Sequence, residues 1–80
     1  MYYVYIIQSI NFSDQIYIGC TENFDQRLSN HNDGTTPHTA QYKPWKLITY
    51  TVFNNKVIAY KFEQYLKSGS GRAFAKKRFW

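Results

Sequence analysis

Apolar residues recur along the chain in patterns that predict three strands. Residues 2–8, YYVYIIQ, are β-branched or aromatic at both odd and even positions, which predicts a central strand covered on both faces. A polar loop follows, and residues 16–20, IYIGC, return as the second strand of a hairpin. Residues 47–53, LITYTVF, alternate and predict the third strand.

The first predicted helix covers residues 21–32, directly after the second strand. Thr21 can cap this helix, and Gly34 is expected to follow its end. Residues 33–46 are rich in turn formers, so we interpret them as a loop that holds one short helical turn near residues 39–42.

Two more helices are predicted after the third strand. The first of them runs from an Asn cap at position 54 or 55 to about residue 67, and Glu63 falls at the border of its buried stripe. Residues 68–71, SGSG, predict a flexible turn, and residues 72–80 predict a short basic helix. The buried stripe is predicted to contain Ile58, Ala59, Phe62, Tyr65 and Leu66.

The composition is that of one small domain, residues 1–80. A chain of this length has no room for a second core, and 44% hydrophobic with 20% aromatic residues suffices for folding unaided. Cys20 is the only cysteine, which excludes an intramolecular disulfide and a Cys-based zinc cluster. No segment approaches the roughly 20 apolar residues that span a bilayer. The first residues also lack a basic targeting region, so we expect a cytoplasmic protein without membrane contact.

Positive charge is concentrated in the second half of the chain. Residues 1–40 hold one cation and four anions, whereas residues 41–80 hold nine cations and one anion, for a net charge of +5. A basic surface of this kind attracts nucleic acid through the release of counterions. The alternative is a solvated surface with no partner. The residues expected to bind nucleic acid are Lys67, Arg72, Lys76, Lys77 and Arg78.

Residues 16–31 bring together side chains that suit a phosphate. Tyr17 lies on the second strand, and Arg27 and His31 are one helical turn apart on the same side of the first helix. A phenol, a guanidinium and an imidazole can therefore converge on one pocket, and the guanidinium can hold a phosphate in bidentate fashion. The alternative is a solvated arginine beside a histidine at the edge of the core.

Two residues from elsewhere in the chain can join this group. We expect Tyr5 to lie opposite Tyr17 on one face of the hairpin, although buried tyrosine pairs that only pack are common. Glu63 is the only acid of the second half, and it is either the i,i+4 partner of Lys67 or a metal ligand that faces the pocket. His38 is interpreted as a polar loop residue, because no other ligand lies at metal spacing.

The site residues occur in a characteristic order and spacing, namely Val4-Tyr5-Ile6, Tyr17-Ile18-Gly19, Arg27, His31 and Glu63. Together they resemble the GIY-YIG endonuclease superfamily, in particular its small single-domain members related to the N-terminal nuclease domain of excinuclease C. The resemblance spans residue 2 to about residue 72. It implies an α+β fold in which a three-stranded, mainly antiparallel sheet is flanked by helices, in the order β-β-α-β-α-α.

That resemblance also implies a role for each site residue. Tyr5 and Tyr17 would be the tyrosines of the two half-motifs, and Arg27 would bind phosphate. Glu63 would be the ligand of one divalent cation, Mg²⁺ or Mn²⁺, and His31 stands where the family has His or Tyr. The implied activity is metal-dependent endonucleolytic hydrolysis of phosphodiester bonds, with DNA as the expected substrate. Tyr17 is the candidate general base.

The chain departs from the family pattern at three places. The first half-motif lacks its glycine, Cys20 stands where some members have a lysine, and residues 72–75 lack the asparagine of excinuclease-type members. Two other functions stay open: a nucleic-acid-binding module without catalysis, which uses the same basic surface, and a small structural domain. Because nucleases of this kind draw specificity from an attached recognition domain, we expect a protein partner to supply it.

Overall fold

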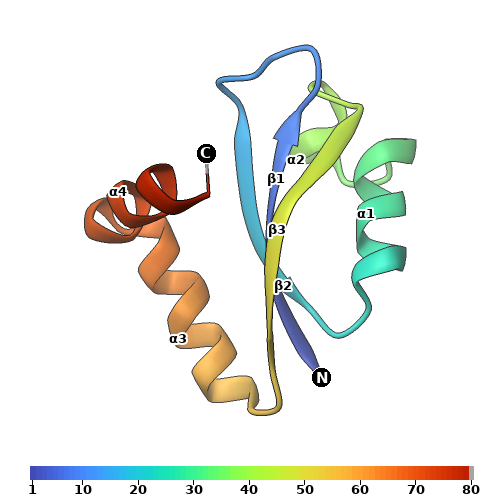
Figure 1. Ribbon diagram of the computed structural model, residues 1–80. Coiled ribbons are helices and arrows are strands. Elements are labelled where there is room, and N and C mark those ends of the chain that lie inside the picture. Colours follow the sequence, from blue (N-terminus) through green and yellow to red (C-terminus); the bar gives the residue numbers. More distant parts are fainter. Residues whose placement is uncertain (80) are drawn as a thin grey trace.

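The computed structural model of the chain describes residues 1–79 as a sheet between two layers of helices. Its elements are β1 (Tyr2–Ser9), β2 (Ile16–Thr21), α1 (Phe24–Asp33), α2 (Pro37–Ala40), β3 (Trp45–Phe53), α3 (Lys56–Lys67) and α4 (Gly69–Arg78). Figure 1 shows the sheet close to edge-on, with α1 and α2 on one side and α3 and α4 on the other. Trp80, where the last helix was expected to end, lies outside the described residues.

Neighbouring strands of the sheet are antiparallel, in the order β2-β1-β3. The predicted α+β fold, a three-stranded antiparallel sheet flanked by helices, is therefore confirmed, and β1 is the central strand that its apolar composition indicated. α2 is the short helical turn expected in the loop, two residues closer to the N-terminus than predicted. In the described part of the chain, no helix is long and apolar enough to cross a membrane.

β1 contributes side chains to two hydrophobic cores, one on each face of the sheet. Successive side chains of a strand point to opposite faces, so the even-numbered residues of β1 face α3 and the odd-numbered residues face α1. The core beneath α3 and α4 contains Val4, Ile6, Ile18, Ala59, Leu66 and Ala75. The core beneath α1 and α2 contains Tyr5, Ile7, Phe24 and Trp45. Tyr5 therefore belongs to the same layer as the helix that carries the predicted phosphate-binding residues.

The register of the hairpin differs from the predicted one. Tyr5 pairs with Gly19, and Tyr17 pairs with Ile7, because the connection turns around residue 12 and not residue 11. The expectation that Tyr5 lies directly opposite Tyr17 was wrong. The two tyrosines are diagonal neighbours on one face, with ring centroids 6.2 Å apart.

The helix α1 begins two residues later than its predicted cap. Asn23 is the cap, and its side chain accepts a hydrogen bond from the backbone N–H of Gln26. Thr21 is the last residue of β2, and its hydroxyl accepts instead from the backbone N–H of Asn23. The end of the helix was predicted correctly: Gly34 follows it with a φ of 84°, a left-handed conformation that glycine adopts without strain.

The SGSG stretch is the first turn of a helix and not a flexible turn. Ser68 caps α4 by accepting from the backbone N–H of Gly71. A Cβ at Gly71 would overlap the backbone of Tyr65. Glycine at this position therefore permits the backbones of α3 and α4 to come into contact. The serine and glycine residues that suggested a flexible turn are thus explained by the cap of α4 and by the close contact between α3 and α4.

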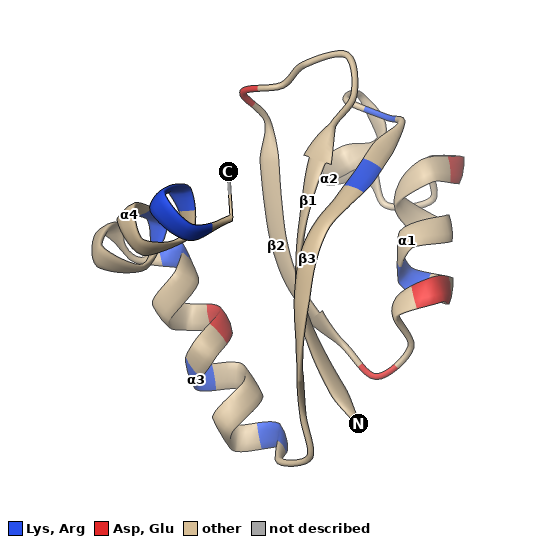
Figure 2. Cartoon of the chain, viewed as in Figure 1, with Lys and Arg blue, Asp and Glu red and all other residues tan. Residues whose placement is uncertain are grey.

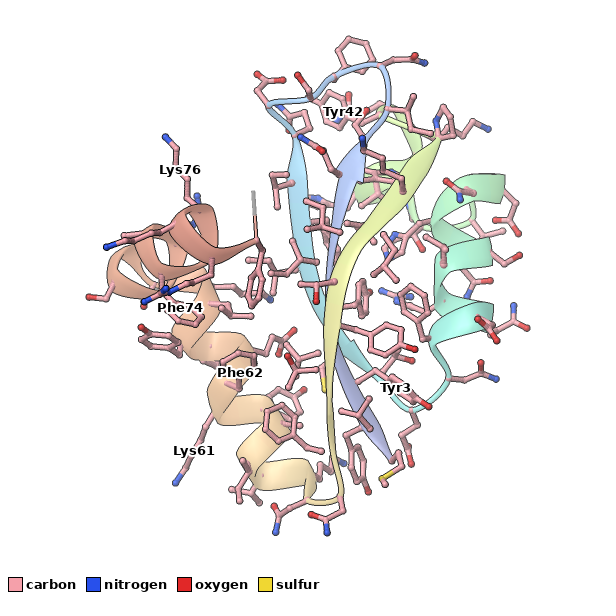
Figure 3. The ribbon with its side chains drawn as sticks, in the orientation of Figure 1. Tyr3, Tyr42, Lys61, Phe62, Phe74 and Lys76 are labelled. Atoms are coloured by element: carbon pink, nitrogen blue, oxygen red, sulfur yellow. The ribbon has the colours of Figure 1, made fainter. Side chains whose placement is uncertain are left out.

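The buried stripe of α3 is also rotated from the predicted one. Its buried residues are Ala59, Glu63 and Leu66, spaced i, i+4 and i+7, whereas Ile58 and Tyr65 are 53% and 42% exposed. The helix α3 has more apolar residues than can fit on the face that packs against the sheet. Hydrophobicity alone therefore did not identify that face. Figure 3 shows Phe62 between α3 and the sheet.

Candidate active site

Tyr5 brings its hydroxyl from the central strand to the edge of the sheet. Its register partner on the edge strand β2 is Gly19, and a Cβ added at Gly19 would overlap the Tyr5 hydroxyl and ring. The Tyr5 phenol thus occupies the space that a side chain at position 19 would fill. The close approach that Gly19 was expected to permit is made by the Tyr5 side chain.

His31 is fully buried and uses both of its ring nitrogens. Its Nε2 lies 3.0 Å from the hydroxyl of Tyr5, and its Nδ1 lies 2.7 Å from the hydroxyl of Thr39. Arg27 Nε donates to the same Tyr5 hydroxyl at 3.3 Å. Trp45 Nε1 donates to the Thr39 carbonyl at 2.9 Å and so fixes α2 against the site. Residues from β1, α1 and α2 therefore form one hydrogen-bonded cluster.

The buried members of this cluster are neutral near pH 7. Burial raises the pKa of Tyr5 to about 12, although the hydrogen bond and the charge of Arg27 act to lower it. Burial and, to a smaller extent, the charge of Arg27 lower the pKa of His31 to about 4. The raised pKa of Tyr5 and the lowered pKa of His31 both keep the shared proton on Tyr5. Tyr5 stays a phenol and is not the general base.

Tyr17 and Arg27 are the members of the group that reach the surface, and both are half-buried. The Tyr17 ring lies 4.9 Å from the His31 ring, between the buried cluster and solvent. The hydrogen bond with Tyr5 raises the pKa of Arg27, burial opposes this, and Tyr17 adds to the increase. Arg27 therefore lies between two phenols and keeps its charge.

Glu63 approaches the site from the other layer of the molecule. It is a buried residue of α3, 7% exposed, and its carboxylate pairs with Lys67 at 3.3 Å. The helix α3 packs on the sheet face opposite α1, so the expectation that the five site residues line one concave surface stays a prediction for Glu63. Burial raises the pKa of Cys20 on β2, and the negative charge of Glu63 raises it further.

A groove of about 660 Å³ follows the free edge of β2. The predicted nucleic-acid-binding residues Lys67, Arg72 and Lys76 line it, whereas Lys77 and Arg78 lie on the last turn of α4 and do not. Figure 2 shows the concentration of Lys and Arg on α3 and α4, in contrast to the single cation of α1. The remaining lining residues are Asp14, Gln15, Ile16, Tyr17, Ile18 and His38.

Tyr17 belongs to both the groove and the buried cluster, so the two features meet at this residue.

Sequence reasoning missed two residues of the site. His38 lines the groove from α2, although it was interpreted as a loop residue without a role. Thr39 was not identified at all, because a threonine in a turn-rich segment gives no signal of the histidine that it contacts.

The sequence is similar to those of known proteins. Residues 1–78 match the family model described as the GIY-YIG catalytic domain. The chain is also 35% identical over 68 residues to the UPF0213 protein CPE1444 of Clostridium perfringens, a stretch that covers 84% of this chain and 71% of that protein. The family match extends from β1 to the end of α4 and includes every site residue described above.

Proposed function

The chain belongs to the GIY-YIG nuclease family, and we propose that it is a metal-dependent endonuclease that hydrolyses the phosphodiester bonds of nucleic acid, with DNA as the expected substrate. The observation that carries this proposal is the position of Tyr17, which lines the basic groove and lies beside Arg27 and the buried cluster. Tyr17 thus connects the groove that would bind a strand with the arginine that the cluster holds in place.

The groove supplies binding that is independent of sequence. Lys67, Arg72 and Lys76 present three positive charges along one wall, and such charges bind phosphates with the release of counterions. Apolar and aromatic side chains of β2 form the floor, which suits contacts to sugars and bases. We expect a protein partner to direct this binding to particular sites, and we place the activity in the cytoplasm, where the Cys20 thiol stays reduced.

The residues at the β2 edge divide the chemistry between them. Arg27 offsets the charge that develops on the phosphoryl group, since the guanidinium keeps its charge and its Nε is held by Tyr5. Tyr17 is the candidate base that takes the proton of the attacking water. Tyr5 and His31 position Arg27 and do not touch the substrate.

The family resemblance implies one divalent cation, Mg²⁺ or Mn²⁺, and the donor set can be tested against it. Among residues 1–79 no three His, Cys, Asp or Glu side chains gather as a closed metal site. Magnesium is commonly held by one or two carboxylates with water and substrate phosphates, so the single carboxylate of Glu63 fits provided that Lys67 moves away. When bound, the cation supplies a Lewis acid for the phosphate and leaving oxygens.

The decisive experiment compares nicking by the wild type and by the Glu63→Gln variant. Supercoiled and branched DNA should be tested in Mg²⁺ and in Mn²⁺. We expect the wild type to nick and the variant to be inactive while it still binds DNA, because only the metal-binding carboxylate is lost. Glu22→Gln, which removes an exposed acid from the β2–α1 connection, is the matched control and should retain activity.

The alternative function is a nucleic-acid-binding module without catalysis. The observation that favours it is the ion pair between Glu63 and Lys67, which engages the only candidate metal ligand. Such a module would bind in the groove without metal. No nicking by either protein would replace the nuclease proposal with this one, whereas equal nicking by the wild type and Glu63→Gln would remove Glu63 and its cation from the mechanism.

A further inference from the structure

Thr39 is a buried residue of α2 that no part of the proposed reaction requires, yet its hydroxyl is aimed at His31. The residue is 1% exposed, and its Oγ1 lies 2.7 Å from His31 Nδ1. Its backbone carbonyl accepts from Trp45 Nε1, so the main chain is held independently of the side chain. The hydroxyl is therefore free to serve the histidine.

The direction of the hydrogen bonds follows from the donors available. Arg27 Nε can only donate, so the Tyr5 oxygen accepts from it. The proton of Tyr5 then needs an acceptor, and among the described residues His31 Nε2 at 3.0 Å supplies one. A neutral histidine has one ring proton, which must then lie on Nδ1 and point at Thr39. The Thr39 hydroxyl in turn donates to the carbonyl of Thr36 at 3.4 Å.

The opposite direction leaves a buried donor without a partner. If Thr39 donated to Nδ1, the proton of His31 would lie on Nε2 and would point at the Tyr5 oxygen. That oxygen would accept twice, and the Tyr5 proton would have no acceptor in a residue that is 1% exposed. The first direction gives every donor of the chain an acceptor, since the Tyr5 proton goes to His31 Nε2 and the His31 proton goes to Thr39 Oγ1.

We propose that Thr39 is a positioning residue whose hydroxyl holds His31 as the Nδ1–H tautomer and, through Tyr5, fixes the orientation of the Arg27 guanidinium. The chain of donors runs from Arg27 to Tyr5, His31 and Thr39, and ends at a backbone carbonyl. The link to catalysis rests on the proposed nuclease function, whereas the tautomer and the arginine orientation do not.

Nitrogen-15 NMR of the folded chain tests the structural part without any activity. In the wild type we expect the His31 Nδ1 signal of a protonated nitrogen, the Nε2 signal of an unprotonated one, and a slowly exchanging Arg27 Nε–H. Thr39→Val, which keeps the shape but lacks the hydroxyl, should lose the single tautomer and speed the Arg27 exchange at least several-fold. Thr39→Ser should restore both signals. Thr35→Val is the control, because the Thr35 hydroxyl bonds only the Asn30 carbonyl.

Two spectroscopic results would overturn the proposal. An Nε2–H tautomer in the wild type would reverse the hydrogen-bond chain and needs no variant to be folded. An unchanged Arg27 Nε–H signal in Thr39→Val would show that the hydroxyl does not orient the guanidinium. If Thr39→Val does not fold, Thr39→Ala provides the same comparison with a smaller side chain.

Kinetics tests whether the orientation matters for the reaction. On the DNA that the wild type nicks, Thr39→Val should lower kcat by roughly tenfold and leave KM within about twofold, since misplacement of a catalytic group slows the chemical step. Thr39→Ser should recover most of the rate. A changed tautomer with an unchanged kcat would contradict the positioning role while leaving the nuclease proposal intact. Absence of wild-type nicking would contradict the nuclease proposal while the NMR result still decides the tautomer.

Discussion

The two helix layers hold different kinds of side chain against the same sheet. The layer of α1 and α2 encloses a buried polar cluster in which Tyr5, His31 and Thr39 are neutral and hydrogen-bonded to one another. The layer of α3 and α4 has an apolar core and carries its cations on the outside, where Figure 3 shows Lys61 and Lys76 extending away from the helices.

This difference indicates that one layer orients a catalytic group and the other layer attracts the nucleic acid by its charge. The α1/α2 layer can hold one arginine in a defined orientation, because a buried hydrogen bond is costly to break. The α3/α4 layer can attract a polyanion without orienting it, because exposed lysines are mobile and act through charge. The layers meet at the free edge of β2, where Tyr17 belongs to both. Substitutions in the two layers should therefore affect different measurements.

The largest effect is expected from removing the oriented charge. Arg27→Ala should lower the nicking rate by roughly 10² or more, because a preorganised charge at the phosphoryl group is lost. Binding should change little, since the groove cations remain. Arg27→Lys is the matched control: it keeps the charge but cannot donate from Nε to Tyr5, so a large residual defect is expected. A rate equal to wild type in Arg27→Lys would show that orientation is irrelevant.

The second prediction concerns stability against acid, which should depend on the α1/α2 layer. The folded pKa of His31 is about 4, below the unfolded value of about 6.5, so the unfolded state binds the proton first. The free energy of unfolding should fall as pH drops from 6.5 toward 4, by about 2 kcal/mol between pH 7 and pH 5. Urea titrations at several pH values measure this change.

His31→Gln isolates the contribution of the histidine to that curve. The groups that face His31, namely Arg27, Tyr5 and Thr39, do not change their charge between pH 7 and pH 5. Subtracting the variant curve from the wild-type curve should therefore leave the His31 contribution. Parallel curves would show that His31 takes up a proton as easily in the folded state as in the unfolded state.

A smaller and different effect is expected in the α3/α4 layer. Replacing Arg72 and Lys76 together by Ala should reduce the dependence of log affinity on log salt by up to about 1.8, or about 0.9 for each phosphate that is no longer neutralised. Lys56 and Lys61, on the exposed face of α3 away from the groove, form the matched control pair with the same change of charge. Equal reductions in the two double variants would mean that net charge matters and the groove does not.

Lys77 and Arg78 provide a further comparison within the same helix. They were predicted to bind nucleic acid from composition, yet they do not line the groove. We expect their double Ala variant to change the salt dependence less than the Arg72 and Lys76 variant. A larger change would place the bound strand over the end of α4.

The elements of the fold were predictable because burial imposes a period on the sequence. β1 is apolar on both faces since both faces are covered, and Gly34 marks the end of α1 by its left-handed backbone. The register was not predictable, because the long connection of the hairpin has no two-residue turn signal to fix its centre. A shift of one residue in that centre changed the partner of Tyr5 from Tyr17 to Gly19.

The candidate site was predictable only in part, for two physical reasons. Arg27 and His31 could be found because i,i+4 spacing places them together on one helix. Thr39 could not, since its contact with His31 depends on how α2 packs and leaves no period in the sequence. Glu63 was placed at the border of the predicted stripe, whereas the stripe is rotated and the pairing of Glu63 with Lys67 allows it to sit among the buried residues.

The smallest effects, from the helix caps, sharpen the comparison between the layers. Asn23 caps α1, which carries Arg27, and Ser68 caps α4, which carries the groove cations Arg72 and Lys76. Replacing either cap by Ala should lower the free energy of unfolding by about 1 kcal/mol, measured in urea. Asn55→Ala is the control, because that cap begins α3 at the end far from the groove.

The two caps should then differ in function although they cost similar stability. Fraying of the first turn of α1 loosens the helix that orients Arg27, so Asn23→Ala should lower the nicking rate by about twofold to fivefold with DNA affinity unchanged. The first turn of α4 lies next to Arg72. Fraying of this turn in Ser68→Ala should weaken the affinity for DNA without a change in the nicking rate at saturating DNA. Asn55→Ala should change neither at 25 °C. If Asn23→Ala and Ser68→Ala alter the same quantity, geometry and charge are not divided between the layers, and the β2 edge works as one cooperative unit.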